Sequence, residues 1–276
     1  SYLLLKYVGG FNNQELAHIF KSWNEGELHS YLIGITAGIF READDLGDGE
    51  LIDRIKDSAK QKGTGRWASI EALKQGVDIS MITSACTARI MSNHLDEREK
   101  AWQLIHSPAV GLSPDKESFA AMVREALYTG KIIAYAQGFS LMQDASRLYG
   151  WNLDLGKIAS IFRAGCIIQA VFLNDITHAF EAEPKPENLI FDGFFLSRIN
   201  EHQDSLRQAV STGVMNGLPI PALCNAVSYL DEFRAKAAGA NLIQAQRDCF
   251  GAHTYERTDR EGVFHHEWRW ANDNQH

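Results

Sequence analysis

A pattern that recurs about 141 residues apart constrains the fold of this 276-residue chain more than any other sequence feature. Three segments in the first half each resemble a segment in the second half, in the same order; the pairs are 16–23 with 158–165, 30–36 with 171–177, and 76–82 with 217–223. Matches at nearly one offset indicate an internal duplication, whereas shared helical periodicity is the alternative explanation. We expect one domain over residues 1–276, with similar halves at about 1–95 and 142–236.

Apolar residues recur at helical spacing through most of the chain, which predicts an all-α fold built as a duplicated helical domain. Trp67, Ile70 and Leu73 step by three along one face before Gly76, a residue that can end a helix. The run 113–115 is a typical helix start, with Ser113 as N-cap and proline at the first helical position, and helical spacing continues to about Tyr149. No stretch shows the alternation and turns of a β-hairpin.

Charge and composition exclude several classes of protein. The chain has 27 Lys+Arg against 35 Asp+Glu and is 45% hydrophobic, so it can form a core, and its acidic balance argues against a nucleic-acid partner. No apolar run is long enough to predict a membrane span. The four cysteines lie far apart without a CxxC pair, so we expect a reducing, cytoplasmic location. Because the sequence begins at Ser1 in the middle of an apolar run, we also expect that it is cut from a longer chain.

Residues 61–67 form the strongest local signal for binding. Two glycines enclose Thr64, Lys62 and Arg66 flank them, and a predicted helix follows. Backbone N–H groups, a hydroxyl and cations at a helix N-terminus suit a phosphate or a carboxylate. The run is neither a P-loop nor a GxGxxG dinucleotide fingerprint, and a plain turn between helices is the alternative. Arg89, on a helix predicted to start near Ser80, would join this site if it points toward Lys62 and Thr64.

A second cluster lies at the end of the last strongly helical stretch. Arg247 can hold a phosphate through two hydrogen bonds, and His253 can donate a hydrogen bond to it or carry charge. The alternative is an ordinary helix C-terminus with Gly251 as its left-handed cap. The remaining histidines show no metal-ligand spacing, so we expect no metal site. No nucleophile elbow and no recognisable Ser/His/Asp order is present either.

Taken together, the motifs resemble those of the 6-phosphogluconate dehydrogenase family. The similarity runs colinearly from Ser1 to about Trp268 and is carried by the segments 61–67, 88–89, 135–139, 165–168, 241–248 and 250–256. It implies the all-helical, internally duplicated C-terminal domain of that family. Two features depart from the family pattern: Cys249 stands where an aromatic residue is common, and the tail 269–276 lacks the usual glycine-rich ending.

The resemblance also implies a function. The family oxidises 6-phosphogluconate with NADP and decarboxylates the product to ribulose 5-phosphate, a step of the pentose phosphate pathway. Its dinucleotide-binding fold and its catalytic lysine and glutamate lie N-terminal to this region, so the resemblance implies no catalytic residue here and no activity of this chain alone. It assigns substrate binding to Lys62, Thr64 and Arg89 of one subunit and to Arg247 and His253 of the partner in a homodimer.

Two other functions stay open at this point. One is a stand-alone, non-catalytic helical module that binds a sugar phosphate or mediates assembly. The other is a related 3-hydroxyacid dehydrogenase, which the duplicated helical domain and the C-terminal phosphate cluster disfavour.

Overall fold

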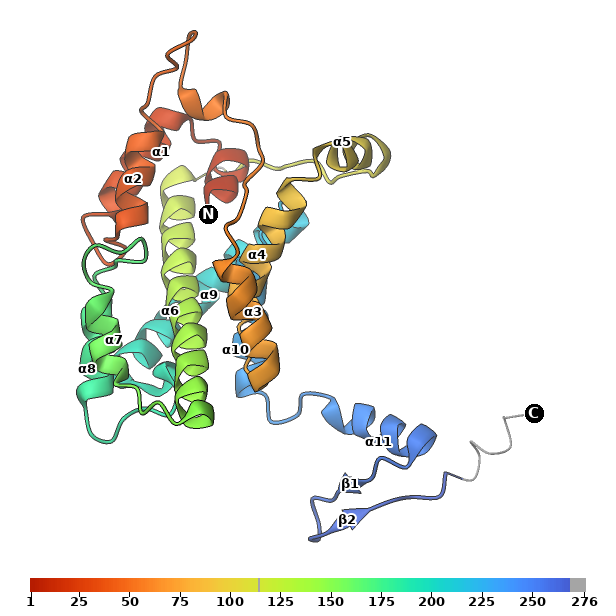
Figure 1. The fold of residues 1–276 in the computed structure, drawn as a ribbon. Helices are drawn as coiled ribbons and strands as arrows, with labels where there is room; N and C mark the ends of the chain where they lie inside the picture. Colours follow the sequence, from red (N-terminus) through yellow and green to blue (C-terminus); the bar gives the residue numbers. More distant parts are fainter. Residues whose placement is uncertain (114, 269–276) are drawn as a thin grey trace. The chain divides into compact units, whose positions relative to one another are not determined.

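The computed structural model describes residues 1–113 and 115–268, and it divides into two compact units, Ser1–Ser228 and Tyr229–His276. Helices make up most of the first unit (Figure 1). In chain order the elements are the π-helical turn η1 (Leu4–Val8), α1 (Asn13–Trp23), α2 (Tyr31–Ile39), the 3-10 turn η2 (Leu51–Asp53), α3 (Thr64–Gln75), α4 (Ser80–Ser92), α5 (Leu95–Leu104), α6 (Lys116–Tyr149), α7 (Leu155–Ile161), α8 (Leu173–Glu181), the 3-10 turn η3 (Leu189–Phe191), α9 (Gly193–Met215), α10 (Pro221–Arg234) and α11 (Ala240–Gly251). Two short antiparallel strands follow, β1 (Tyr255–Glu256) and β2 (Val263–Phe264). The predicted all-α class is therefore confirmed, with one two-residue strand pair that the sequence did not indicate.

Helix α6 is the centre of the first unit, and α9 packs along it (Figure 1). Its buried residues include Val123, Ile132 and Ile133, none of which is exposed. Gly130 allows a close approach, because a Cβ at that position would lie 3.2 Å from Cδ2 of Leu223 on α10. The apolar periodicity of this helix thus reflects contact with several neighbours, and burial of these side chains supplies most of the driving force for folding.

The ends of α6 correct one detail of the sequence prediction. Its N-cap is Asp115, whose carboxylate accepts hydrogen bonds from the backbone N–H groups of Glu117 and Ser118 at 3.1 and 3.2 Å. The predicted cap, Ser113, is wrong, because the carboxylate two residues later satisfies these donors; the proline predicted at the first helical position lies outside the described residues. The helix ends at Tyr149, which confirms the predicted end, and the residue after it, Gly150, has a left-handed conformation with φ at +66°.

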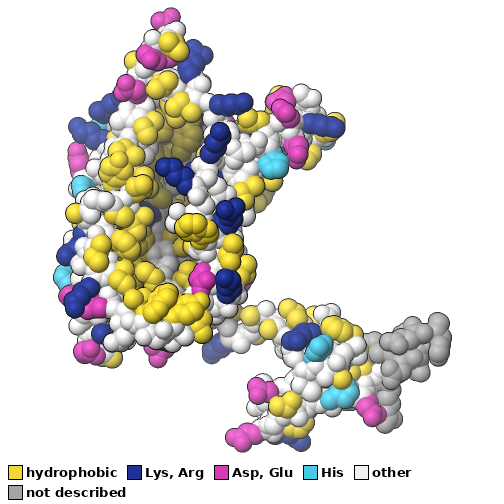
Figure 2. Space-filling model, viewed as in Figure 1, with side chains coloured by type: hydrophobic (Ala, Val, Ile, Leu, Met, Phe, Trp, Pro, Cys, Tyr) yellow, Lys and Arg dark blue, Asp and Glu magenta, His cyan; other side chains and the backbone are white. Residues whose placement is uncertain are grey.

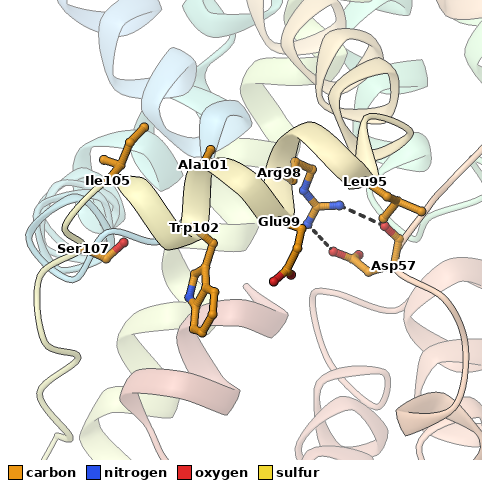
Figure 3. A pocket seen from close by; sticks show the side chains of 8 residues that line it. All are labelled: Asp57, Leu95, Arg98, Glu99, Ala101, Trp102, Ile105 and Ser107. Atoms are coloured by element: carbon orange, nitrogen blue, oxygen red, sulfur yellow. Dashed lines mark hydrogen bonds and ion pairs between the residues drawn. The ribbon is translucent and has the colours of Figure 1, made fainter.

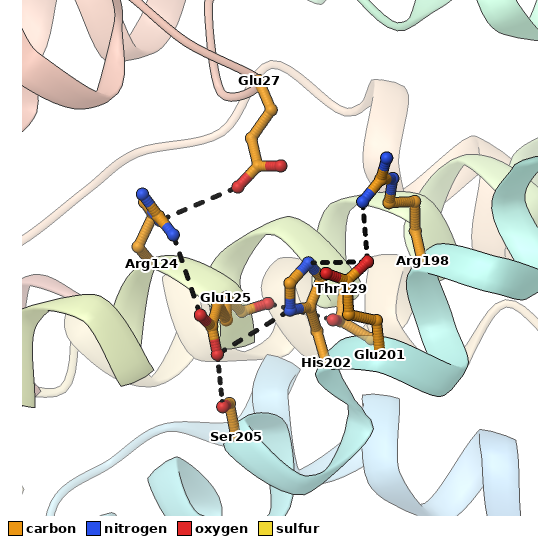
Figure 4. A network of polar contacts seen from close by, with 8 residues as sticks. All are labelled: Glu27, Arg124, Glu125, Thr129, Arg198, Glu201, His202 and Ser205. Atoms are coloured by element: carbon orange, nitrogen blue, oxygen red, sulfur yellow. Dashed lines mark hydrogen bonds and ion pairs between the residues drawn. The ribbon is translucent and has the colours of Figure 1, made fainter. Parts of the chain in front are cut away.

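A polar network adds to the apolar contacts between α6 and α9 (Figure 4). Glu125 accepts a hydrogen bond from the Ser205 hydroxyl at 2.6 Å, and its carboxylate lies 3.7 Å from Nδ1 of His202. Arg124 contacts the same carboxylate at 3.7 Å and also lies 3.7 Å from Glu27. Because the donors and acceptors lie at fixed places, this network orients α6 relative to α9 in a way that apolar contacts alone do not.

The order helix, helix, 3-10 turn, helix, helix occurs twice in the chain. It is formed first by α1, α2, η2, α3 and α4, and again by α7, α8, η3, α9 and α10. An antiparallel bridge between Ser30 and Ala170 joins the segments that precede α2 and α8. Among the described residues, no helix combines the length and apolarity that crossing a membrane requires.

Candidate functional site

The loop before α3 carries the first predicted cluster. Gly63 precedes the helix with φ at +106°, a conformation that glycine adopts without strain, and no side chain caps the helix at this end. The first N–H groups of α3 therefore have no side-chain cap, and the exposed residues Lys62 and Thr64 lie at this end of the helix. A helix N-terminus flanked by a lysine and a hydroxyl offers an anion hydrogen-bond donors and positive charge at once.

Helix α4 holds the same loop in place. The Arg89 guanidinium donates a hydrogen bond to the Lys60 carbonyl oxygen, and the Ala59 N–H donates to the Ser92 hydroxyl at 3.0 Å. Farther along, the Cys86 thiol donates to the side-chain oxygen of Gln61 at 3.1 Å. Arg89 therefore contacts the loop two residues before Lys62, so the structure brings Lys62, Thr64 and Arg89 to one end of the α3–α4 pair.

Close packing of α3 and α4 keeps this arrangement compact. A Cβ at Gly65 would lie 3.5 Å from Cβ of Cys86, and Ser69 accepts a hydrogen bond from Thr83 at 3.0 Å. Figure 2 shows Lys and Arg side chains gathered over the loop and along these helices. The combination is chemically suited to holding a phosphate group, because positive charges and N–H donors converge there.

The second predicted cluster belongs to the second unit and is described by itself. Arg247 lies on α11, is exposed, and donates to the Gln244 side-chain oxygen at 3.0 Å. His253 follows the helix, is also exposed, and its ring lies 5.8 Å from that of Phe250. The left-handed residue that ends α11 is Ala252, with φ at +49°, and not Gly251, which is the last helical residue.

Asp248 is a residue that the sequence analysis missed. It is fully buried, and its carboxylate accepts hydrogen bonds from Thr254, His265, His266 and Trp268. The one signal for this residue in the sequence is its position next to Arg247 and before the adjacent histidines His265 and His266. That spacing alone does not indicate burial.

Two of the pockets in the first unit lie away from residues 61–67. One, of about 660 Å³, lies along α5, where Arg98 binds the Asp57 carboxylate at 2.6 Å and Trp102 forms a wall (Figure 3). It contains none of the predicted site residues. The other, of about 300 Å³, has apolar walls from α2, α6 and residues 167–170.

The smaller pocket contains a partly buried lysine. Lys131 donates to the Ser30 hydroxyl at 3.3 Å, its ammonium lies 5.4 Å from the centre of the Phe172 ring, and burial lowers its pKa to about 8. Beside it, the Tyr135 hydroxyl donates to the Ile168 carbonyl oxygen, and burial raises the pKa of that tyrosine to about 12. No carboxylate among the described residues forms an ion pair with Lys131.

Comparison with known proteins places these residues in context. Residues 1–268 match the family model described as 6-phosphogluconate dehydrogenase, C-terminal domain. Relatives named 6-phosphogluconate dehydrogenase, decarboxylating, from Lactococcus lactis subsp. lactis (strain IL1403) and Staphylococcus aureus (strain N315) are 49% and 47% identical over 268 residues. In both comparisons the match covers 97% of this chain and 57% of the relative.

A solved structure is also similar. It is the Plasmodium falciparum 6-phosphogluconate dehydrogenase, determined in its apo form, with its cofactor NADP+ and with its substrate 6-phosphogluconate. The TM-score is 0.93 at 40% identity, over 97% of this chain and 58% of that one. The chain therefore spans just over half the length of the relatives that it matches.

Proposed function

The chain belongs to the family of 6-phosphogluconate dehydrogenase C-terminal domains, as its motifs predicted, and on this premise we propose that it is the substrate-binding and dimerisation part of such an enzyme. The complete enzyme would oxidise 6-phosphogluconate with NADP and decarboxylate the product to ribulose 5-phosphate. The observation that carries this proposal is the family match over residues 1–268. The structure of the Plasmodium falciparum enzyme with NADP+ and 6-phosphogluconate supports the substrate and the cofactor.

Substrate binding is the role that we propose for the two cationic clusters. Lys62, Thr64 and Arg89 would hold the phosphate and neighbouring groups from one subunit, and Arg247 and His253 would reach the same substrate from the partner. Charge-assisted hydrogen bonds from these residues would fix the sugar in place for a reaction carried out by other groups. The one sheet among the described residues is the two-stranded pair of β1 and β2, so the parallel sheet of a dinucleotide-binding fold is not among them, and we assign no cofactor contact to them.

Arg247→Ala tests the substrate proposal in the complete enzyme, meaning this chain preceded by the dinucleotide-binding part that we propose for it. Losing hydrogen bonds to a charged phosphate should weaken binding by about 1.5–3 kcal/mol, which raises KM for 6-phosphogluconate roughly tenfold to a hundredfold. Arg234→Ala is the matched control, because Arg234 is exposed and pairs with Asp231 at 3.0 Å. An unchanged KM in the Arg247 variant would count against the assigned role.

A homodimer is the assembly that we propose. Large apolar side chains lie open to solvent on α3 and α5: Trp67 is 67% exposed, Leu73 82% and Trp102 74%. A second copy of the chain that covers such side chains would remove them from water.

Sedimentation at micromolar concentration should give twice the 30.9 kDa chain mass, and Leu73→Lys should shift it toward the monomer. Leu46→Lys is the control, because Leu46 is 93% exposed on a loop. A monomeric wild type would remove this part of the proposal.

Two smaller points complete the proposal. The recurring order of elements supports an origin of the two halves, at about 1–95 and 142–236, by duplication. A cytoplasmic location is supported by the four free cysteines, Cys86, Cys166, Cys224 and Cys249, which a reducing compartment keeps as thiols.

A further inference from the structure

The segment that carries Arg247 and His253 has an unusual kind of core. Among the described residues 231–268, Asp248 is the only buried one, and its exposed fraction is 0%. One carboxylate oxygen accepts from the Thr254 backbone N–H at 3.0 Å and from Nδ1 of His265 at 2.8 Å. The other accepts from the His266 backbone N–H at 3.0 Å and from Nε1 of Trp268 at 2.9 Å. Hydrogen bonds to one buried carboxylate thus hold this segment together, whereas a larger domain is held together by packed apolar side chains.

These four donors come from separate places in the segment. Thr254 lies in the turn directly after α11, whereas His265, His266 and Trp268 follow β2. The pairing of β1 with β2 joins the same two regions through the backbone. Asp248 therefore links three things: the end of α11, the turn after it, and the chain beyond the hairpin.

The turn around His253 is strained and needs such support. Ala252 and Thr254 flank the histidine with φ at +49° and +60°, and neither is glycine. A non-glycine residue in this region costs of order 1 kcal/mol or more and persists only where its surroundings hold it. Here the Thr254 N–H binds Asp248, and the Gln244 side chain donates to the Thr254 carbonyl oxygen. Both contacts come from α11, the helix that carries Arg247.

The carboxylate is ionised under ordinary conditions. Burial by itself raises the pKa of Asp248, but hydrogen bonds from His265, His266 and Trp268 outweigh it and hold the pKa well below the ordinary 3.8. An ionised carboxylate has no proton of its own to donate, so both oxygens accept. Asparagine cannot reproduce this, because in either orientation its NH₂ group faces two N–H donors.

We propose that Asp248 is a positioning residue of the substrate site: its hydrogen bonds hold the strained turn 252–254 in the conformation that presents His253, on the helix end that carries Arg247. The inference rests on the proposed function, because it assumes that these two residues bind the substrate phosphate. Asp248 itself contacts neither substrate nor cofactor in this account. Its effect passes entirely through the two residues that it holds.

Asp248→Asn in the complete enzyme is the test. KM for 6-phosphogluconate should rise roughly tenfold, in the range expected for weakened hydrogen bonds to a charged group, while kcat stays within about twofold. In a background that carries Arg247→Ala and His253→Ala, the same substitution should leave KM unchanged, because nothing remains to be positioned. Asp259→Asn is the matched control: Asp259 lies in the same segment but is exposed and pairs with Arg257 at 2.7 Å.

A second variant and a second measurement guard against misfolding. Trp268→Phe removes one of the four donors and should raise KM in the same direction by a smaller factor. Hydrogen exchange at the Thr254 amide should become faster in Asp248→Asn and stay unchanged in Asp259→Asn, a readout that needs no catalysis. If Asp248→Asn does not fold, the Trp268 variant decides the question.

Two results would overturn the inference. One is a wild-type KM in both the Asp248 and the Trp268 variants; the other is an equal rise in KM with and without Arg247 and His253. Failure of the proposed function looks different. In that case the unmodified complete enzyme does not turn over 6-phosphogluconate, or Arg247→Ala leaves KM unchanged, and the inference falls with it.

Discussion

Replacing Lys131 with methionine should make this protein more stable. The ammonium of Lys131 faces a largely apolar pocket, with one hydrogen bond to Ser30 at 3.3 Å and the Phe172 ring 5.4 Å away. Burial lowers the pKa of Lys131 from 10.5 to about 8. A single pKa unit corresponds to 1.36 kcal/mol, so the buried charge costs about 3 kcal/mol of folding free energy at pH 7. Methionine has a similar unbranched shape and no charge.

Not all of that free energy is recovered. The substitution removes the Ser30 hydrogen bond and the contact with the aromatic ring, each worth about 1 kcal/mol. The expected net gain in the free energy of unfolding at pH 7 is about 1–2 kcal/mol. Lys157→Met is the matched control, since that side chain is 80% exposed and its charge stays in water. It should change stability by less than about 0.5 kcal/mol.

The gain should depend on pH with a definite sign. Below pH 8 the amine is charged in both the folded and the unfolded state, so the wild type carries the full cost of the buried charge. Between about 8 and 10.5 the unfolded chain binds more protons than the folded one, so wild-type stability rises with pH. The advantage of methionine should therefore be largest at pH 7 and shrink as the pH approaches 10.5.

Urea unfolding followed by circular dichroism at pH 7 and pH 10 measures this directly. A methionine variant less stable than the wild type at pH 7 would refute the reasoning, because it would mean that Lys131 has a favourable partner. A gain of equal size at both pH values would do the same, since the effect would then come from packing alone.

Three further substitutions test the fold and the loop. Gly63→Ala should lower the free energy of unfolding by about 1 kcal/mol or more, because φ at +106° strains any other residue; a stability unchanged in urea would contradict this. Phe172→Ala should cost about 3–5 kcal/mol in the same assay, since the ring is 1% exposed and contacts those of Tyr128 and Tyr135; a loss below about 1 kcal/mol would show that the site collapses. Asn12→Ala removes the capping box of α1 and should lower the free energy of unfolding by about 1 kcal/mol, whereas Asn12→Ser should keep most of that stability. Equal free energies of unfolding for the two variants would contradict the role of the cap.

Much of the fold could be predicted because helices leave a local pattern. The long apolar run that ends near Tyr149 is α6, and Gly76 and Gly150 end their helices in left-handed conformations. The prediction was wrong by two residues at Ser113, because two good capping residues lie close together and geometry selects Asp115. The strands β1 and β2 were missed, since two residues are too few to show a period of two.

The candidate site divides in the same way. Lys62 and Thr64 could be named from the sequence because a glycine-rich turn before a helix is a local arrangement. The contact of Arg89 with the Lys60 carbonyl joins residues 29 positions apart, and no spacing rule predicts it. The family motifs pointed to Arg247 and His253, but nothing in them indicated that the Asp248 carboxylate accepts a hydrogen bond from the turn that contains His253.

The sequence alone indicated the all-α class, the course of α3 and α6, the start of α4, the loop that carries the glycines, and the family to which the chain belongs. Only the tertiary structure decided which residues are buried. Trp67 and Leu73 are apolar and repeat at helical spacing, yet they are exposed, whereas the charged Asp248 is enclosed. The physical reason is that helix formation depends on neighbours within four positions, whereas burial depends on partners that the fold brings in from elsewhere. For Asp248 those partners lie 6 to 20 residues away, and only their hydrogen bonds make a buried carboxylate stable.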